Sequence, residues 1–199
     1  MRRLVAVENV SLDGVMQSPA GPDEDPSGGF TRGGWAVELL ARDPEAAQAA
    51  MGSQGGRSTA MLFGRRTYLQ LVGHWLSTTE PNPFTDILRD TTKYIASRTL
   101  TDPLPYPNSI LLTGDASRAV EKLKAEGEGD IVVLGSGALL RDLAAAGLVD
   151  AYVLTILPVV LGSGARLFGN TYAPLSVTSS YTSPTGIVVA TYEVGSADQ

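Results

Sequence analysis

The chain has 199 residues, of which 43% are hydrophobic and 18% are charged, which is enough apolar material for one sizeable core. The net charge is −6 and the 15 basic residues are scattered along the chain, which argues against nucleic-acid binding. There is no cysteine and only one histidine, His74, which excludes disulfides and thiolate zinc sites and gives little support to a triad hydrolase.

The first predicted element is a buried strand at residues 4–10, an apolar run that contains Glu8. The run ends at Ser11-Leu12-Asp13-Gly14 rather than at a small-residue cleavage site, so we do not expect a signal peptide. No apolar stretch is long enough to span a membrane, and we therefore expect a cytoplasmic protein. Residues 17–34, rich in Gly, Pro and Asp, are predicted to form a long loop, followed by helices at 35–41 and 44–51 and a break at 52–56.

Strands and helices alternate through the middle of the chain. Short apolar runs predict strands at 59–63, 93–97, 109–113 and 130–134. Helical patterns occur at 65–72, 84–90, 116–126 and 138–146.

Three strands close the chain. The first is an apolar run at 151–160 that carries Pro158. Residues 174–183 and 186–194 are predicted to pair as an antiparallel hairpin, and a loose tail follows at 196–199. We therefore expect an α/β fold of one domain, residues 1–199, with a mostly parallel mixed sheet, helices on both faces and an antiparallel edge.

The turn Gly135-Ser136-Gly137 follows one of the buried strands and opens a helix. Glycines let the backbone approach a ligand closely, and helix N-terminal amides favour an anion such as pyrophosphate. Only two glycines are present, so an ordinary tight turn stays open as the alternative.

A second strand-to-helix turn contains Gly64, Arg65, Arg66 and Thr67. Thr67 can bond a phosphate, and an arginine supplies a fixed positive charge. Cations are unfavourable at a helix start unless an anion is present, which favours a phosphate site over two surface arginines.

A third strand ends at Ser97, Arg98 and Thr99, which could line a ribose or a phosphate, although a plain polar turn is the simpler interpretation. Ligands of open α/β sheets sit at the carboxyl ends of strands, so three such ends predict one binding crevice.

Asp13 follows the first strand and could hold a substrate amine or relay a proton, although Asp-Gly is commonly only a turn. Phe30 and Trp35 lie among glycines and suit a lid or a wall for a planar ring, the alternative being a disordered loop. Glu38 is a candidate acid or a solvated helix residue. No carboxylate cluster has metal-ligand spacing, so no metal is expected.

Taken in order, these segments resemble the dihydrofolate-reductase-like superfamily, in particular the branch related to the riboflavin-biosynthesis reductase domain. The motifs that carry the resemblance are Ser11-Leu12-Asp13-Gly14, Gly28-Gly29-Phe30, Gly33-Gly34-Trp35, Leu62-Phe63-Gly64-Arg65-Arg66-Thr67-Tyr68, Lys93-Tyr94-Ile95-Ala96-Ser97-Arg98-Thr99-Leu100, Leu134-Gly135-Ser136-Gly137, Gly147-Leu148-Val149-Asp150 and Pro158-Val159-Val160-Leu161-Gly162-Ser163-Gly164-Ala165-Arg166-Leu167-Phe168.

The resemblance implies a three-layer fold with a mixed sheet of about eight strands, a frequent homodimer and an NADPH cofactor. By analogy, the cofactor-binding residues would be Gly64, Arg65, Arg66 and Thr67 near the phosphates, Ser97, Arg98 and Thr99 near the adenosine, and Gly135, Ser136, Gly137, Ala138 and Leu139 at the pyrophosphate. Asp13 would sit near the nicotinamide and the substrate.

The sequence departs from this branch at several positions. Val133 and Leu134 stand where riboflavin-pathway reductases usually carry a Glu, and Asp150-Ala151 replaces their Asp-Glu. The zinc deaminase often fused to them is excluded, because it needs cysteines.

We therefore predict an NADPH-dependent reductase of a small heterocyclic or carbonyl substrate, pterin-like or ribosylaminopyrimidine-like. It would resemble 5-amino-6-(5-phosphoribosylamino)uracil reductase or dihydrofolate reductase. The arginine pair favours NADPH over NADH. The alternative is a non-catalytic nucleotide-binding or dimeric interaction protein on the same fold.

Overall fold

The computed structural model describes residues 1–52, 57–80 and 82–195. These residues group into two compact units, each assembled from separate stretches of the chain. Unit 1 takes the described residues of Met1–Leu4 and Arg57–Leu148, and unit 2 those of Val5–Gly56 and Val149–Gln199. Most of the break expected at 52–56, and the tail 196–199, lie outside the described residues. The single domain spanning residues 1–199 stays a prediction.

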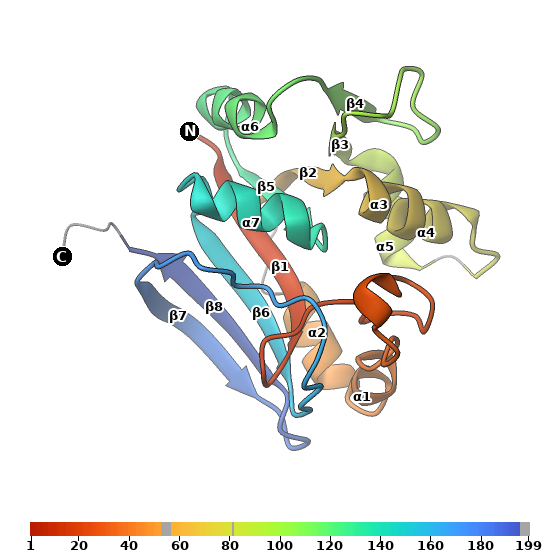
Figure 1. Cartoon of the computed structure of the whole chain (residues 1–199), viewed down its shortest axis with the longest axis vertical. Helices are drawn as coiled ribbons and strands as arrows, with labels where there is room; N and C mark the ends of the chain where they lie inside the picture. The colour runs from red at the N-terminus through yellow and green to blue at the C-terminus, as the bar shows by residue number, and fades with distance from the viewer. Residues whose placement is uncertain (53–56, 81, 196–199) are drawn as a thin grey trace. The chain divides into compact units, whose positions relative to one another are not determined.

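The strands form an eight-stranded sheet in the order β4-β3-β2-β5-β1-β6-β8-β7 (Figure 1). Pairing is parallel among β4, β3, β2 and β5 and between β1 and β6, whereas β8 is antiparallel to both β6 and β7. The strands are β1 (Arg3–Ser11), β2 (Ser58–Gly64), β3 (Thr92–Ala96), β4 (Ser109–Leu112), β5 (Asp130–Leu134), β6 (Ala151–Leu157), β7 (Leu175–Thr182) and β8 (Val188–Val194). The predicted α/β class, mostly parallel with an antiparallel C-terminal hairpin, is confirmed.

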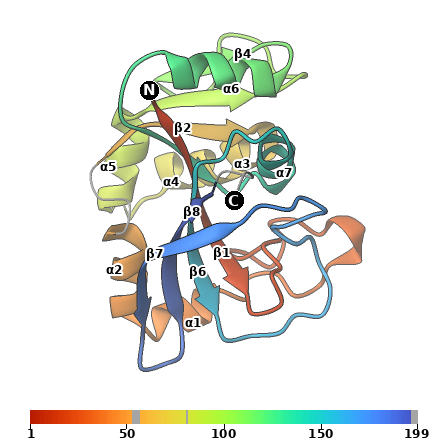
Figure 2. The same cartoon turned by 90° about the vertical axis from the view of Figure 1, so that its left-hand side faces the viewer.

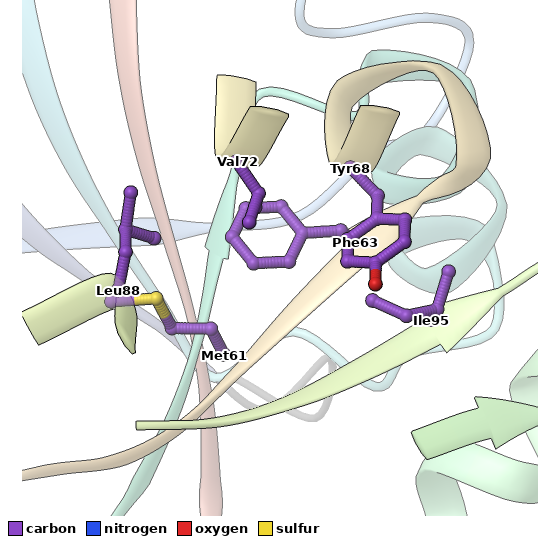
Figure 3. Close-up of a cluster of buried hydrophobic side chains, with 6 residues drawn as sticks. All are labelled: Met61, Phe63, Tyr68, Val72, Leu88 and Ile95. Atoms are coloured by element: carbon purple, nitrogen blue, oxygen red, sulfur yellow. The ribbon is translucent and has the colours of Figure 1, made fainter. Parts of the chain in front are cut away.

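Unit 1 has helices on both faces of its strands (Figure 1). Its helical elements are α3 (Arg65–Thr67), the π-helical turn η2 (Tyr68–Val72), α4 (Gly73–Ser77), α5 (Pro83–Asp90), α6 (Ala116–Ala125) and α7 (Gly137–Ala145). On one face, a buried cluster joins Met61, Phe63, Tyr68, Val72, Leu88 and Ile95 (Figure 3). Each such side chain stabilises the fold by roughly 1.5–3 kcal/mol relative to exposure, so the cluster anchors η2 and α5 on β2 and β3. On the other face, Gly64 has Ser136 and Leu139 at the start of α7 as neighbours.

The helix predicted at 65–72 continues to Ser77 through η2 and α4. Gly73 lies inside this helical stretch, where it makes room for Tyr106. The hydroxyl oxygen of Tyr106 occupies the place that a side chain at Gly73 would take. The Tyr106 ring packs edge-on against Tyr68 with 5.2 Å between the ring centroids. This glycine therefore serves close packing against Tyr106.

Unit 2 contains β1 from Val5 onward, the hairpin of β7 and β8, and β6. Its helical elements are η1 (Ser27–Gly29), α1 (Val37–Ala41) and α2 (Pro44–Gly52). Strand β6 ends at Leu157, three residues earlier than predicted, because Pro158 cannot donate to a strand ladder. Asp43 ties α2 to the β7–β8 turn, since its carboxylate accepts from the Ala46 N–H at 2.9 Å and from the Thr185 hydroxyl.

No helix in the part of the chain that the structure describes is long and apolar enough to cross a membrane.

Candidate functional site

The turns predicted to bind phosphate start at one edge of the unit 1 strands. Gly64 at the end of β2 pairs with Ala96 at the end of β3, and Leu62 pairs with Val133 of β5. Parallel strands in this register end together, so the turns that follow them open along the same edge. The structure thus brings together the three predicted cofactor-binding turns of unit 1.

Ser136 locks the turn after β5 onto the turn after β2. Its hydroxyl accepts a hydrogen bond from the N–H of Gly64 at 2.9 Å, and its own N–H donates to Thr67 Oγ1 at 3.0 Å. Ser136 is held in the left-handed conformation, with φ of 58°. This conformation costs a non-glycine residue about 1–2 kcal/mol, which the two reciprocal hydrogen bonds help to offset.

Gly135 allows Thr67 to come this close. It also has a positive φ of 58°, and a Cβ added here would lie 3.1 Å from the Thr67 methyl carbon. A side chain at this position would therefore be strained and would push against Thr67. Gly135 is thus part of the same lock.

The first turn of α7 presents amides that the Ser136 side chain does not cap. The Ser136 hydroxyl instead accepts the hydrogen bond from the N–H of Gly64. The first N–H groups of a helix have no partner inside the helix, and they carry the positive end of its dipole. The amides of Gly137, Ala138 and Leu139 therefore offer a position of the kind that binds phosphate groups.

Positive charge stands at the neighbouring strand ends. Arg65 and Arg66 at the start of α3 are exposed, as are Arg98 and Thr99 after β3. Ser97 has a structural task, because its hydroxyl accepts from the N–H of Thr99 at 3.2 Å and closes its own turn. The predicted cofactor-binding residues therefore divide into two kinds. Some, such as Ser97, shape the turns, and others, such as Arg65 and Arg98, are exposed and could reach a ligand.

A fourth strand, predicted at 109–113 without a binding role, ends in the same row. Leu112 at the end of β4 pairs with Ala96 of β3. The turn that follows contains Gly114, with φ of 81°, and Asp115, whose carboxylate caps α6 through the N–H of Arg118 at 2.9 Å. It shows the same signal as the other three, a short apolar strand followed by Gly and a polar residue.

In unit 2, Asp13 is held by the loop that follows β6. One carboxylate oxygen accepts from the Ser11 hydroxyl at 2.7 Å and from the Leu161 N–H at 3.0 Å, and the other accepts from the Gly162 N–H at 2.9 Å. Arg166 adds a bond from Nε to the Asp13 carbonyl oxygen at 3.0 Å. Asp13 thus joins the turn after β1 to the glycine-rich loop after β6.

These bonds hold the pKa of Asp13 at about 2, below its ordinary value of 3.8. The N–H of Leu161 is the largest cause, followed by the Ser11 hydroxyl and the Gly162 N–H. A carboxyl group with this pKa is ionised at neutral pH and has no proton to donate. The geometry favours a positioning role for Asp13 over that of a proton donor.

Gln17, which the sequence analysis did not single out, organises the predicted long loop. Its side-chain oxygen accepts from the Ala165 N–H at 2.7 Å, and its side-chain nitrogen donates to the carbonyls of Asp25 and Ser27, each at 2.9 Å. The Trp35 indole donates to the Gln17 carbonyl at 2.8 Å. The Gln17 side chain therefore holds the middle of this segment, and its backbone carbonyl holds the far end through Trp35.

The three remaining candidates of unit 2 differ in exposure. Phe30 is 5% exposed and packs in a cluster with Val15 and Leu161, so its ring lies inside the loop. Trp35 is only partly buried against this cluster. Glu38 lies on an exposed face of α1, paired with Arg42 at 3.5 Å, as in the solvated-helix interpretation.

Among the described residues, no group of three His, Asp or Glu side chains is placed to hold a metal ion.

Comparisons with known proteins identify a family, a relative of similar sequence and several solved structures of similar fold. The family model of the RibD C-terminal domain matches residues 2–189. An uncharacterized protein of Bacillus subtilis strain 168, YyaP, is 28% identical over 176 residues, covering 84% of this chain and 80% of YyaP.

Solved structures resemble the chain in fold. A putative riboflavin biosynthesis protein of Shewanella sp. PV-4 has a TM-score of 0.63 at 21% identity, covering 98% of this chain and 99% of its own. A pyrimidine reductase-like protein of Corynebacterium diphtheriae, DIP1392, has a TM-score of 0.61 at 16% identity, with coverages of 98% and 92%. RibD of Acinetobacter baumannii has a TM-score of 0.59 at 15% identity, and the match covers 98% of this chain and 58% of that one.

Proposed function

Because this chain belongs to the RibD C-terminal domain family, we propose that it is an NADPH-dependent reductase of a small heterocyclic or carbonyl substrate. When bound, the cofactor supplies a hydride. The substrate class we propose is pterin-like or ribosylaminopyrimidine-like. The proposal includes a cytoplasmic location, where NADPH is available.

The observation that carries the proposal is the pair of hydrogen bonds that joins the turn after β2, with Gly64 and Thr67, to the turn after β5, with Gly135 and Ser136. Ser136 and Thr67 hold the turns together, while the first amides of α7 stay free of a Ser136 cap. This arrangement fits a pyrophosphate, which needs close backbone approach and unpaired N–H donors. We assign the pyrophosphate to Gly135, Ser136, Gly137, Ala138 and Leu139.

The exposed cations of unit 1 would complete the cofactor site. Arg65 and Arg66 supply guanidinium groups suited to a phosphate fork, so we assign them to the additional phosphate of NADPH. The turn Ser97–Arg98–Thr99 would lie toward the adenosine.

On the substrate side, the chain's own residues would hold the loop and the substrate in place and would not donate a proton. Asp13, ionised and bonded to Leu161 and Gly162, would hold the loop after β6 in place. Trp35 would offer its partly exposed ring to a planar substrate. The proton would come from water.

The test is a titration of NADPH and NADH by cofactor fluorescence, followed by an NADPH-oxidation assay with pterin, flavin and ribosylaminopyrimidine substrates. Arg65→Gln should weaken the binding of NADPH about tenfold, which is the order of one charge-assisted hydrogen bond. The affinity for NADH should stay unchanged. Ile110→Gln, an exposed change on β4, is the matched control.

The outcomes separate the alternatives. Tight binding with no oxidation of any substrate would identify a non-catalytic nucleotide-binding protein instead. Equal loss of NADPH and NADH in Arg65→Gln would remove the role assigned to this arginine. Absence of binding to either cofactor would overturn the whole proposal.

A further inference from the structure

The long loop after β1 folds back on itself, so that its two ends meet. The N–H of Gly34 donates to the Ser18 carbonyl at 2.8 Å. One residue further out on each side, the Trp35 indole donates to the Gln17 carbonyl, also at 2.8 Å. The segment is therefore a compact loop with adjacent ends, as in Ω-loops, which are frequently functional.

The inside of this loop is packed and hydrogen-bonded. Ser18 is 3% exposed and has a positive φ of 54°. Its hydroxyl donates to the Gly21 carbonyl at 3.1 Å and accepts from the Asp25 N–H at 2.8 Å. Gly33 passes so close to this stretch that a Cβ there would lie 2.5 Å from the carbonyl oxygens of Gly21 and Pro22. The loop thus has a defined conformation of its own.

The Gln17 side chain, which is 7% exposed, joins this loop to the loop after β6. Figure 2 shows the two loops side by side, as does Figure 1. The amide oxygen accepts from the Ala165 N–H of one loop, and the amide nitrogen donates to the Asp25 and Ser27 carbonyls of the other. A primary amide serves all three partners, because it carries an acceptor and two donors. An ionised carboxylate of the same length has no donor.

Trp35 lies where the two loops meet. Its ring is partly buried against the cluster of Val15, Phe30 and Leu161, to which both loops contribute. Phe30 in turn lies so close to Gly164 that a Cβ there would be 2.8 Å from the ring. The indole therefore has a fixed place, set by its hydrogen bond and by this packing, while part of its surface stays exposed.

We propose that Gln17 is a positioning residue for the substrate: by joining the two loops, it holds Trp35 as a fixed wall on which the planar ring of the substrate stacks. A wall that is ordered beforehand spares the substrate the entropic cost of ordering a loop. Gln17 would act on substrate affinity and not on hydride transfer, because it contacts neither reactant. This inference rests on the proposed function, which assigns the substrate to Trp35.

The first experiment follows Trp35 by fluorescence and needs no turnover. The chain has two tryptophans, so Trp75→Phe leaves Trp35 as the only one, and the other variants are made in this background. Gln17→Met keeps the length of the side chain but removes its acceptor and its donors. It should shift Trp35 emission to longer wavelength and increase acrylamide quenching. Gln48→Met, the same change at an exposed position of α2, should change neither.

A second variant guards against a general loss of folding. Gln17→Glu keeps an acceptor for the Ala165 N–H but, when ionised, offers no donor to the Asp25 and Ser27 carbonyls. It should also shift Trp35 emission, and both Gln17 variants should keep the circular-dichroism spectrum and the NADPH affinity of the wild type. Wild-type emission in either Gln17 variant would overturn the proposal, as would equal shifts in the Gln48→Met control.

The third measurement is the steady-state kinetics of NADPH oxidation with the pterin, flavin or ribosylaminopyrimidine substrate that the wild type reduces. Both Gln17 variants should raise KM about threefold to tenfold, the order of one aromatic contact, and leave kcat unchanged. An unchanged KM, or a lower kcat at the same KM, would overturn the proposal.

Failure of the proposed function would look different. A wild type that reduces no substrate would overturn that function and, with it, the substrate role of Gln17. The fluorescence of the Gln17 variants would still show whether Gln17 holds Trp35, so the two failures can be told apart.

Discussion

The hydroxyl of Ser136 and the backbone N–H of Gly64 are joined by a hydrogen bond of 2.9 Å across 72 residues of sequence. It links the two strand ends from which the proposed cofactor site is built. The same serine donates its own N–H to Thr67. The first two predictions test these two bonds separately.

Ser136→Ala should destabilise the fold and weaken NADPH binding. The change leaves the partly buried N–H of Gly64 without its partner, which costs roughly 1–3 kcal/mol, and it keeps the left-handed strain. Ser136→Gly is the matched variant, because it loses the same bond but relieves about 1–2 kcal/mol of strain. Urea unfolding should rank wild type, Gly and Ala in decreasing stability. Equal stability of the Gly and Ala variants would show that the left-handed strain contributes nothing.

Thr67→Val should weaken the binding of NADPH and of NADH to the same degree. Thr67→Ser should keep most of the affinity for both cofactors. Valine retains the methyl carbon near Gly135 but removes the oxygen that accepts the Ser136 N–H, and serine does the reverse. The expected loss for valine is about 1–3 kcal/mol of unfolding free energy. Fluorescence titration of both cofactors checks the pattern. A larger effect of serine than of valine would assign the role to the methyl group instead.

Asp13→Asn should make the free energy of unfolding depend less on pH in the acid range. The folded-state pKa of Asp13 is about 2, below its ordinary value of 3.8. Its carboxylate therefore stabilises the fold above about pH 4, and this contribution is lost as the pH falls toward 2. Asparagine lacks the second acceptor oxygen, so the variant should be less stable than wild type at pH 7, and the difference should shrink at pH 3. Urea midpoints at both pH values measure it, and a difference that is the same at both would contradict the assignment.

Gly164→Ala should be more damaging than Gly162→Ala. Both glycines have positive φ, 109° and 74°, so each substitution carries a backbone cost of about 1–2 kcal/mol. A Cβ at Gly164 would in addition lie 2.8 Å from atoms of Phe30 and Val15, whereas Gly162 has nothing within 4 Å. Overpacking of this kind adds roughly 1–3 kcal/mol. Thermal unfolding of the two variants should differ accordingly, and equal melting temperatures would show that the Phe30 ring yields freely.

The strands of unit 1 were predictable because their signals are local. Residues 130–134 were predicted and observed as a strand, and the prediction at 59–63 differs from β2 by one residue at each end. Both are apolar runs closed by a glycine, and such patterns depend on neighbouring residues only. The three turns predicted to bind phosphate could be located for the same reason, because each directly follows such a strand.

The links between distant residues were not predictable. Gln17 bonds to the Ala165 N–H across 148 positions, and Asp13 bonds to Leu161 across the same separation. Nothing in the composition around Gln17 distinguishes it from a surface glutamine. The sequence marked Asp13 as a candidate but left open whether it donates a proton, because its pKa depends on the Leu161 and Gly162 amides from a distant part of the chain as well as on the Ser11 hydroxyl.

The place of β8 in unit 2 has a consequence for how the chain is made. β8 is synthesised after β6 and β7, yet it is inserted between them. Until Val188–Val194 emerges, the buried side chains of β6 have no neighbour on that side, and non-local pairing of this kind is slow and prone to aggregation. Unit 2 therefore lacks this strand until Val194 has been synthesised, and a chain truncated before residue 188 should expose the buried side chains of β6 and aggregate.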